Sequence, residues 1–276
     1  MNNDIIVTGP PRSGTTLTCF LLNKVEDTIA LNEPMNLKMF PSKNEGIKQT
    51  QQFFKEMRAS LTQDKTAIAR QVAGRIPDNI FPIHQSDNSG PRKNIATKGR
   101  VRFDKELTSN FKLILKHNAH FTFLLDKLTP HYKCYAIIRN PVSTIASWNS
   151  IDAPVSRGNL NVLKSLDQDL YNDIELIPDL IDRQVFLLHK LFECYKNLST
   201  ANIIRYEDVV ESGGKCLSVI SDNANRLEDK LTSKNKNKLY DERLIAQIRE
   251  KLLSFDGAFW QYYDKRDVIE LPTNKN

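Results

Sequence analysis

A glycine-bearing loop between a buried strand and a helix start constrains the fold of this chain more than any other feature. Residues 4–8 read Asp-Ile-Ile-Val-Thr, an apolar run of strand length, and a helical pattern begins near Thr15. Gly9 and Gly14 have the spacing of a phosphate-binding loop, but Thr15 stands where nucleoside-triphosphate enzymes carry a lysine. The sequence therefore predicts a strand, phosphate loop and helix without the lysine that contacts β- and γ-phosphates.

This loop is expected to bind anions even without the lysine. Backbone N–H groups of residues 12–17 would point into one concavity at a helix N-terminus. Arg12 adds a planar guanidinium that can donate to two oxygens of one anionic group. No strand end carries the apolar run and aspartate that hold magnesium in nucleoside triphosphatases, so we expect no metal. A plain glycine turn with a chance Arg-Ser pair is the alternative interpretation.

Composition indicates one globular domain over residues 1–276, with 40% hydrophobic residues. The net charge of +6 combines 39 basic with 33 acidic residues, which favours a small anionic ligand over nucleic acid. The four cysteines are scattered without a Cys-x-x-Cys pair, as in reduced intracellular proteins. Because no signal sequence and no apolar run of membrane length is visible, the sequence predicts a cytoplasmic protein without a membrane partner.

Strand-length apolar runs alternate with helical patterns, which predicts the α/β class. We expect a P-loop-like, three-layer fold with a central, mostly parallel sheet of about five strands flanked by helices. The expected strands are 4–8, 28–32, 112–116, 133–138 and 201–206. The expected helices are 14–24, 45–63, 118–128, 141–149, 160–176, 179–199 and 241–254, so that residues 160–200 form a helical segment. The polar, turn-rich stretch 77–97 is expected to form a lid or surface loop near the site.

Charged residues cluster where the expected strands end. In an open parallel sheet the carboxyl ends of the strands face one crevice, where ligands bind. A single charge there often only marks the end of a buried strand, but five together predict a binding crevice. These residues are Arg12, Glu33, Lys116, Arg139 and Arg205.

Two motifs make the chain resemble the sulfotransferases that use 3′-phosphoadenosine-5′-phosphosulfate (PAPS). Residues 11–16, Pro-Arg-Ser-Gly-Thr-Thr, resemble the 5′-phosphosulfate loop in the arginine version of tyrosylprotein and many bacterial sulfotransferases. Residues 138–141, Ile-Arg-Asn-Pro, followed by Ser147, resemble the 3′-phosphate element of the family. Since Pro141 can start a helix, Ser147 would lie about two turns along and face much the same way as Arg139.

Two weaker motifs agree with this resemblance, which covers residues 5–208. Residues 205–208, Arg-Tyr-Glu-Asp, look like the late strand-end motif whose tyrosine, here Tyr206, lies near the adenine. Lys116 occupies the place of the central lysine that contacts the transferring sulfuryl group. The arginine-lysine-glycine element of the cytosolic steroid and phenol enzymes is absent, and Lys215 or the run 234–238 are candidates to replace it.

The resemblance implies a sulfotransferase that uses PAPS as co-substrate, releases 3′-phosphoadenosine-5′-phosphate (PAP) and requires no metal. The implied nucleotide-binding residues are Arg12, Ser13, Gly14, Thr15, Thr16, Leu17, Arg139, Ser147 and Tyr206. Arg12 and Lys116 would stabilise the bridging oxygen, with the hydroxyls of Thr15 and Thr16 as further donors. Glu33 is the expected base, unless it only orients Arg12 through a salt bridge. His117 and His120 are the alternative bases.

The acceptor stays open at this point. A small polar molecule with a hydroxyl or amino group, such as a natural product, is the first hypothesis, and a carbohydrate is the second. An acidic run would attract a cationic acceptor, and it comprises Asp167, Asp169, Asp173, Glu175, Asp179 and Asp182. A basic stretch would attract an anionic one, and it comprises Arg92, Lys93, Lys98, Arg100, Arg102 and Lys105. Two other hypotheses are an ATP-dependent P-loop small-molecule kinase and a non-catalytic nucleotide-binding protein. No pattern fixes the oligomeric state.

Overall fold

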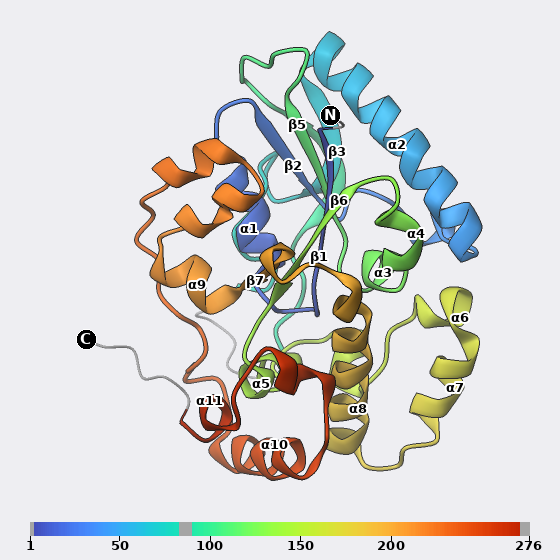
Figure 1. Cartoon of the computed structure of the whole chain (residues 1–276), viewed down its shortest axis with the longest axis vertical. Helices are drawn as coiled ribbons and strands as arrows, with labels where there is room; N and C mark the ends of the chain where they lie inside the picture. The colour runs from blue at the N-terminus through green and yellow to red at the C-terminus, as the bar shows by residue number, and fades with distance from the viewer. Residues whose placement is uncertain (1–2, 83–89, 271–276) are drawn as a thin grey trace.

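A five-stranded parallel sheet organises the protein. The computed structural model describes residues 3–82 and 90–270. The strands lie in the order β2-β5-β1-β6-β7, and every neighbouring pair is parallel (Figure 1). This arrangement confirms the predicted α/β class. The strands are β1 Asp4–Thr8, β2 Thr28–Asn32, β5 Lys112–Lys116, β6 Lys133–Ile138 and β7 Ile203–Arg205.

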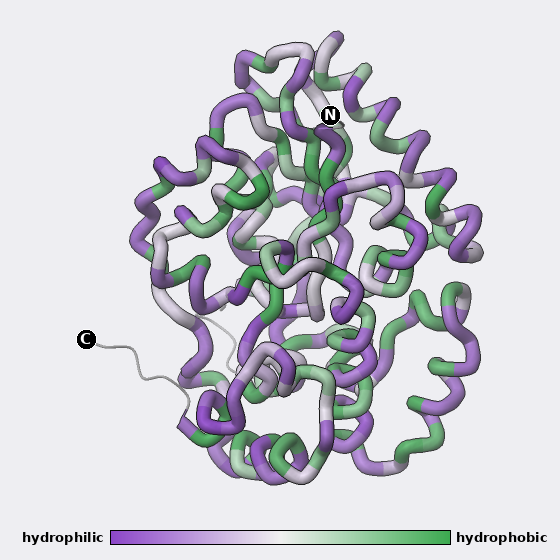
Figure 2. Tube along the Cα trace, viewed as in Figure 1, coloured by the Kyte–Doolittle hydropathy of each residue, from purple (hydrophilic) through white to green (hydrophobic). Residues whose placement is uncertain are grey.

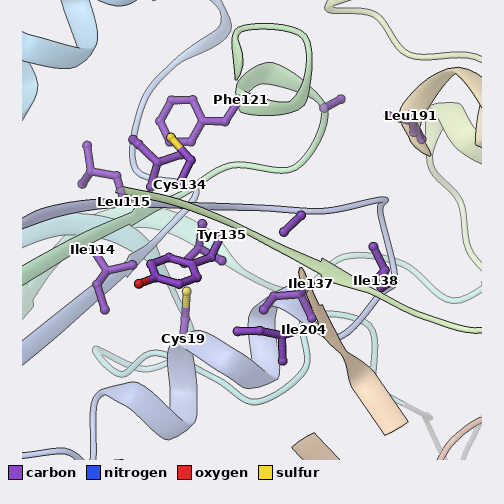
Figure 3. Close-up of a cluster of buried hydrophobic side chains, with 14 of the residues drawn as sticks. Cys19, Ile114, Leu115, Phe121, Cys134, Tyr135, Ile137, Ile138, Leu191 and Ile204 are labelled. Carbon is purple, nitrogen blue, oxygen red and sulfur yellow. The ribbon is translucent and has the colours of Figure 1, made fainter. Parts of the chain in front are cut away.

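The sheet is buried on both faces, which explains why its strands are almost continuously apolar. Side chains that alternate along β6 enter two separate layers of the core (Figure 3). Tyr135 points toward Cys19 of the first helix, whereas Cys134 points toward Phe121 on the opposite face. All of these side chains are at most 5% exposed, so the sheet is the middle layer of three.

Helices form the two outer layers. One face of the sheet is covered by α1 Thr15–Leu22 and α9 Tyr206–Glu211, and the other by α2 Lys43–Asp64, α3 Ala119–Thr122 and α4 Leu125–Leu128 (Figure 1). The remaining helices are α5 Pro141–Trp148, α6 Leu163–Leu166, α7 Gln168–Glu175, α8 Leu180–Glu193, α10 Glu242–Ser254 and α11 Lys265–Ile269. Apolar residues gather along the strands and polar ones along the outer helices (Figure 2). No helix in the described part of the chain is long and apolar enough to cross a membrane.

Short 3-10 helices connect the larger elements. They are η1 Leu37–Met39, η2 Pro154–Arg157, η3 Cys194–Asn197, η4 Thr200–Asn202, η5 Lys215–Val219, η6 Asp222–Arg226 and η7 Ala258–Gln261.

Helix α5 fixes the direction in which the chain leaves β6. Pro141 occupies the first turn, where its missing N–H costs nothing, and the side chain of Asn140 accepts a hydrogen bond from Ser143 N at 3.3 Å. All eight residues of the helix are buried. Arg139 is therefore held rigidly at the junction of strand and helix.

The sequence did not predict the strands β3 Thr66–Gln71 and β4 Thr97–Arg102. They pair only with each other, as an antiparallel ribbon beside the main sheet. In β4 only Val101 is buried, so the strand lacks the apolar alternation by which a half-buried strand is found.

Other boundaries differ from the prediction for local reasons. The expected helix 160–176 divides at Asp167, whose side chain accepts a hydrogen bond from Leu170 N at 3.1 Å and so starts α7. The expected helix 118–128 likewise divides into α3 and α4. Tyr206 was placed in the last strand but begins α9. Of the expected loop 77–97, residues 83–89 lie outside the described residues, and Phe81 is buried rather than on the surface.

Candidate active site

A cavity of about 1090 Å³ opens at the carboxyl ends of β1 and β2. Small-molecule sites usually measure ~300–1,000 Å³, so this cavity has room for a nucleotide and a second ligand. Two groups of polar side chains lie at its walls or directly behind them. The loop cluster consists of Arg12, Arg139, Ser147, Tyr206 and Lys234. The ribbon cluster consists of Glu33, Arg70, Lys98, Lys116 and His120.

The phosphate-loop segment has the backbone that its glycines predict. Gly14 has a φ of 94°, a left-handed conformation that favours glycine, and a Cβ there would lie 2.6 Å from Cδ2 of Tyr206. Helix α1 begins at Thr15 without a side-chain cap, so N–H groups of its first turn stay available to a ligand. One expected donor is already used, because Ser13 N donates to Pro10 O at 3.1 Å.

Arg12 reaches from the loop to Ser147 of helix α5. Its Nε donates to Ser147 Oγ at 3.2 Å, and its Nη1 donates to Asn79 Oδ1 at the same distance. The guanidinium carbon lies 5.0 Å from the ring centroid of Phe81, a cation–π contact. The structure thus brings the Arg12 side chain to the helix that was expected to hold a 3′-phosphate.

Arg139 ties the loop to the C-terminal part of the chain. Its Nη1 donates to Arg12 O at 3.1 Å, its Nε to Asn235 Oδ1 at 2.8 Å, and its Nη2 to Lys234 O. The guanidinium also lies 4.8 Å from the ring centroid of Tyr206, which lines the cavity. Segment 230–234 therefore closes this end of the cavity, and Lys234 is placed beside Arg139.

Lys215, the other basic candidate for the 3′-phosphate site, lies away from the cavity. Lys215 pairs with Glu228 at 2.9 Å in an exposed position, whereas Lys230 and Lys234 line the cavity. Of the C-terminal cations that the sequence suggested for the 3′-phosphate, Lys234 is therefore the one that lines the cavity.

The loop cluster carries positive charge that no carboxylate neutralises. Burial and the nearby guanidiniums of Arg92 and Arg139 lower the pKa of Arg12 to about 10. Within the described residues, no Asp or Glu oxygen lies within ion-pair distance of Arg12, Arg92 or Arg139. A group of buried and half-buried cations without counter-charge is costly unless an anion binds there.

Glu33 is the centre of the ribbon cluster. Its Oε1 lies 2.9 Å from Lys116 Nζ, and its Oε2 lies 3.0 Å from Arg70 Nε. Burial opposes ionisation, but the attraction of Lys116 and Arg70 outweighs it and lowers the Glu33 pKa to about 2. The alternative in which Glu33 forms a salt bridge with Arg12 is wrong, because Lys116 and Arg70 are the partners of Glu33.

Lys116 is fully buried behind Glu33. Its Nζ donates to Asn32 Oδ1 at 3.1 Å and to Glu33, and its side chain is 0% exposed. Backbone bonding fixes the pair, since Glu33 N donates to Lys116 O at 2.8 Å. Glu33 therefore faces the cavity and Lys116 acts on the cavity through it.

The two alternative bases differ in their surroundings. The Nε2 of His117 accepts a hydrogen bond from Met35 N at 3.0 Å, and burial holds the His117 pKa well below 6.5. His120 lines the cavity, and its buried Nε2 has no hydrogen-bond partner among the described residues. Burial lowers the His120 pKa to about 4, so its ring is neutral at pH 7. Both histidines line the cavity, and the unpartnered buried Nε2 makes His120 the better placed of the two to bind a ligand.

The remaining predicted residues divide between the cavity and the protein interior. Thr16 and Leu17 line the cavity, whereas the hydroxyl of Thr15 donates to Asn118 Oδ1 at 2.8 Å. Arg205 was wrongly expected to face the crevice. Its guanidinium lies 4.5 Å from the ring centroid of Tyr263, and its Nη2 is 3.7 Å from a carboxylate oxygen of Asp267.

The acidic run does not line the cavity, so it is not placed to attract a cationic acceptor there. Asp167 and Asp179 accept hydrogen bonds from backbone N–H groups at the starts of α7 and α8. Asp182 pairs with Lys251 at 2.8 Å. In the basic stretch, Lys98 lines the cavity, whereas Arg100 donates to the hydroxyls of Ser60 and Thr66.

The sequence did not point to Asn118 or Arg70 as residues of the cavity. Asn118 positions the hydroxyl of Thr15, and Arg70 belongs to the unpredicted ribbon. Lys98, on the same ribbon, was named only as a member of the basic stretch, and no short motif identifies any of the three.

No protein-family model and no curated protein sequence matches the chain. Over residues 3–82 and 90–270, no three His, Cys, Asp or Glu side chains are grouped as metal ligands. The geometry and charge of the cavity are therefore what indicates the function.

Proposed function

We propose that the protein transfers the sulfuryl group of PAPS to a hydroxyl or amino group of a small acceptor. The observation that carries this proposal is a pair of arginines beside the uncapped start of α1, the buried Arg139 and the half-buried Arg12. Neither has a carboxylate partner among the described residues. PAPS is a ligand with two separate anionic groups. The N–H groups at the start of α1 suit the 5′-phosphosulfate, and Arg12, Arg139 and Ser147 suit the 3′-phosphate.

The same residues disfavour ATP as the donor. ATP has a 3′-hydroxyl and would leave the charge of Arg139 without an anion. Thr15, at the position of the missing lysine, spends its hydroxyl on Asn118 and cannot replace an ammonium group. Tyr206, which packs between Gly14 and Arg139 and lines the cavity, is the aromatic side chain placed to contact the adenine.

The proposed reaction is an in-line displacement at sulfur. The acceptor oxygen or nitrogen forms a bond to sulfur while the bond between sulfur and the bridging oxygen breaks, and PAP leaves with the electron pair. Negative charge grows on the departing phosphate, where the N–H groups at the start of α1 stabilise it. The acceptor proton passes to Glu33, with His120 as the alternative, because both line the cavity.

Glu33 also has a positioning role in this proposal. Its two carboxylate oxygens hold Lys116 and Arg70 in place, so its removal would disturb the charge around the reacting group as well as remove a base. The acceptor is a small molecule, and a carbohydrate stays the alternative. The four cysteines are all free thiols, in keeping with the cytoplasmic location that the proposal retains.

Isothermal titration calorimetry tests the choice of nucleotide. We expect PAP to bind without Mg²⁺, and ATP with Mg²⁺ to bind at least a hundredfold more weakly. Equal affinities, or a requirement for Mg²⁺, would exclude the proposal in favour of a kinase. Turnover of labelled PAPS over a panel of acceptors then separates an enzyme from a nucleotide-binding protein that binds PAP without catalysis.

A further inference from the structure

Two cations face each other directly across the β3–β4 ribbon. Arg70 and Lys98 are register partners in this antiparallel pair. Like charges at directly opposed positions destabilise a β-pair. Both side chains line the cavity, so the repulsion is placed at a ligand site and not in open solvent.

The carboxylates nearby do not balance this charge. Glu33 is shared between Lys116 and Arg70. Outside the loop cluster, Asp78 is the other carboxylate among the described lining residues, and Lys38 is a further cation there. Together the four cations and two carboxylates leave a surplus of two positive charges. Burial, and then repulsion from Arg70, lower the pKa of Lys98 to about 8, which reflects the same imbalance.

Both cations keep donors for a ligand. The Nζ of Lys98 donates to Met35 O and to Asn36 Oδ1, the latter at 2.7 Å, which leaves one of its three N–H bonds. Arg70 meets Glu33 through Nε alone, so the outer N–H groups of its guanidinium have no partner in the described part of the chain. Such a fork matches the oxygens of a carboxylate, sulfate or phosphate.

We propose that the acceptor is itself anionic, and that Arg70 and Lys98 bind its carboxylate, sulfate or phosphate group beside Glu33. This inference rests on the proposed sulfuryl transfer and names the acceptor class for it. The sequence left the charge of the acceptor open, and Lys98 of the basic stretch now favours a negative one. Apolar residues of the same cavity suit the carbon skeleton of the acceptor, and they are Leu37, Ile80, Val155, Leu160 and Val162.

Anion binding here would also change Glu33. An oxyanion that takes the charge of Arg70 weakens one of the two attractions that lower the Glu33 pKa. Glu33 then becomes a stronger base only when an acceptor of the right charge is bound. This coupling reconciles the low pKa of Glu33 in the free protein with a role as the base.

The test compares matched ligands on PAP-saturated protein. The anionic probes are 4-hydroxyphenylacetate, 4-hydroxyphenyl sulfate and 4-hydroxyphenyl phosphate, and the neutral control is 4-hydroxyphenylacetamide. By calorimetry we expect at least one anionic probe to bind tenfold or more tightly than the amide, and the order among the three identifies the preferred oxyanion. If no anionic probe binds more tightly than the amide, the proposal is wrong.

Two variants locate the effect. Lys98→Met should remove the preference for the anionic probe and change PAP affinity by less than twofold. Arg100→Met is the matched control, since Arg100 lies on the same strand but donates to Ser60 and Thr66 on the outside, and it should keep the preference. Equal losses in both variants, or a parallel loss of PAP affinity in Lys98→Met, would overturn the assignment.

A pH titration gives a second readout. The charged and titratable neighbours of Lys98 are Glu33, Arg70, His117 and His120. The pKa values of Glu33, His117 and His120 are all lowered, so these three groups do not change charge between pH 7 and pH 9. The affinity for the anionic probe should fall above pH 8 as Lys98 loses its proton, and this fall should be absent in Lys98→Met. A profile that is flat in the unsubstituted protein would contradict the proposal. Failure of PAP to bind at all would instead refute the sulfotransferase function itself.

Discussion

Replacing Glu33 by glutamine should destabilise the protein strongly, because it leaves a buried ammonium group without its counter-charge. Lys116 is fully buried, and Glu33 at 2.9 Å is its one anionic partner within residues 3–82 and 90–270. Removing one member of a buried ion pair typically costs ~3–5 kcal/mol. The lowering of the Glu33 pKa from 4.5 to about 2 corresponds to about 3 kcal/mol at neutral pH, so two routes give a similar value.

The pH dependence has a defined sign. The folded state holds the Glu33 pKa below its unfolded value of 4.5, so the stabilisation is complete above pH 4.5. It is lost as the pH falls from 4.5 toward 2, because Glu33 then binds a proton in the unfolded state first. Glu33→Gln should show a weaker loss of stability over this acid range than the unsubstituted protein.

Urea unfolding followed by circular dichroism measures the effect, and a double-mutant cycle isolates the pair. We expect Glu33→Gln to lower the unfolding free energy by about 3 kcal/mol. Adding Lys116→Met should restore much of it, since an apolar side chain of similar length removes the unpaired charge. A coupling energy within about 0.5 kcal/mol of zero would refute the reasoning.

Three further outcomes follow from the site. Arg139→Met should weaken PAP binding ~10–100-fold by calorimetry, because a hydrogen bond to a charged group contributes ~1.5–3 kcal/mol, and should weaken its 3′-hydroxyl analogue far less; equal losses would contradict the 3′-phosphate assignment. Gly14→Ala should lower thermal stability by more than about 1 kcal/mol, since its Cβ would lie 2.6 Å from Tyr206; an unchanged melting temperature would show that the loop tolerates a side chain. Glu33→Gln should abolish most turnover of labelled PAPS at nearly unchanged PAP affinity, and His120→Ala should not; the reverse result would move the base to His120.

The central sheet could be predicted because each strand is rich in apolar residues and is buried on both faces. Residues of β1, β5 and β6 are almost all buried, and this leaves a direct signal in the sequence. The phosphate loop was also found locally, since Gly9 and Gly14 adopt the conformations that their spacing indicates. Both features are properties of short segments.

The ribbon could not be predicted in the same way. The sequence of β4, Thr-Lys-Gly-Arg-Val-Arg, has the composition of a solvated loop, and only its pairing with β3 makes it a strand. The error over Arg205 has a related cause. A charged residue at the end of a strand can turn toward the crevice or away from it, and Tyr263, distant in the chain, holds Arg205 on the outside. These outcomes depend on tertiary contacts that a local pattern does not contain.

The charge distribution separates two tasks within one cavity. At the loop cluster Arg12 and Arg139 donate to uncharged protein groups, and no carboxylate in the described part of the chain is ion-paired with either. An anion that binds there would therefore supply a negative charge without competing with a carboxylate. At the ribbon cluster Glu33 already holds Lys116 and Arg70, so an incoming anion must compete with it. The first arrangement favours tight binding of a nucleotide, and the second links binding to a change in the protonation of Glu33. A base that is weak until the acceptor arrives would limit wasteful transfer of the sulfuryl group to water.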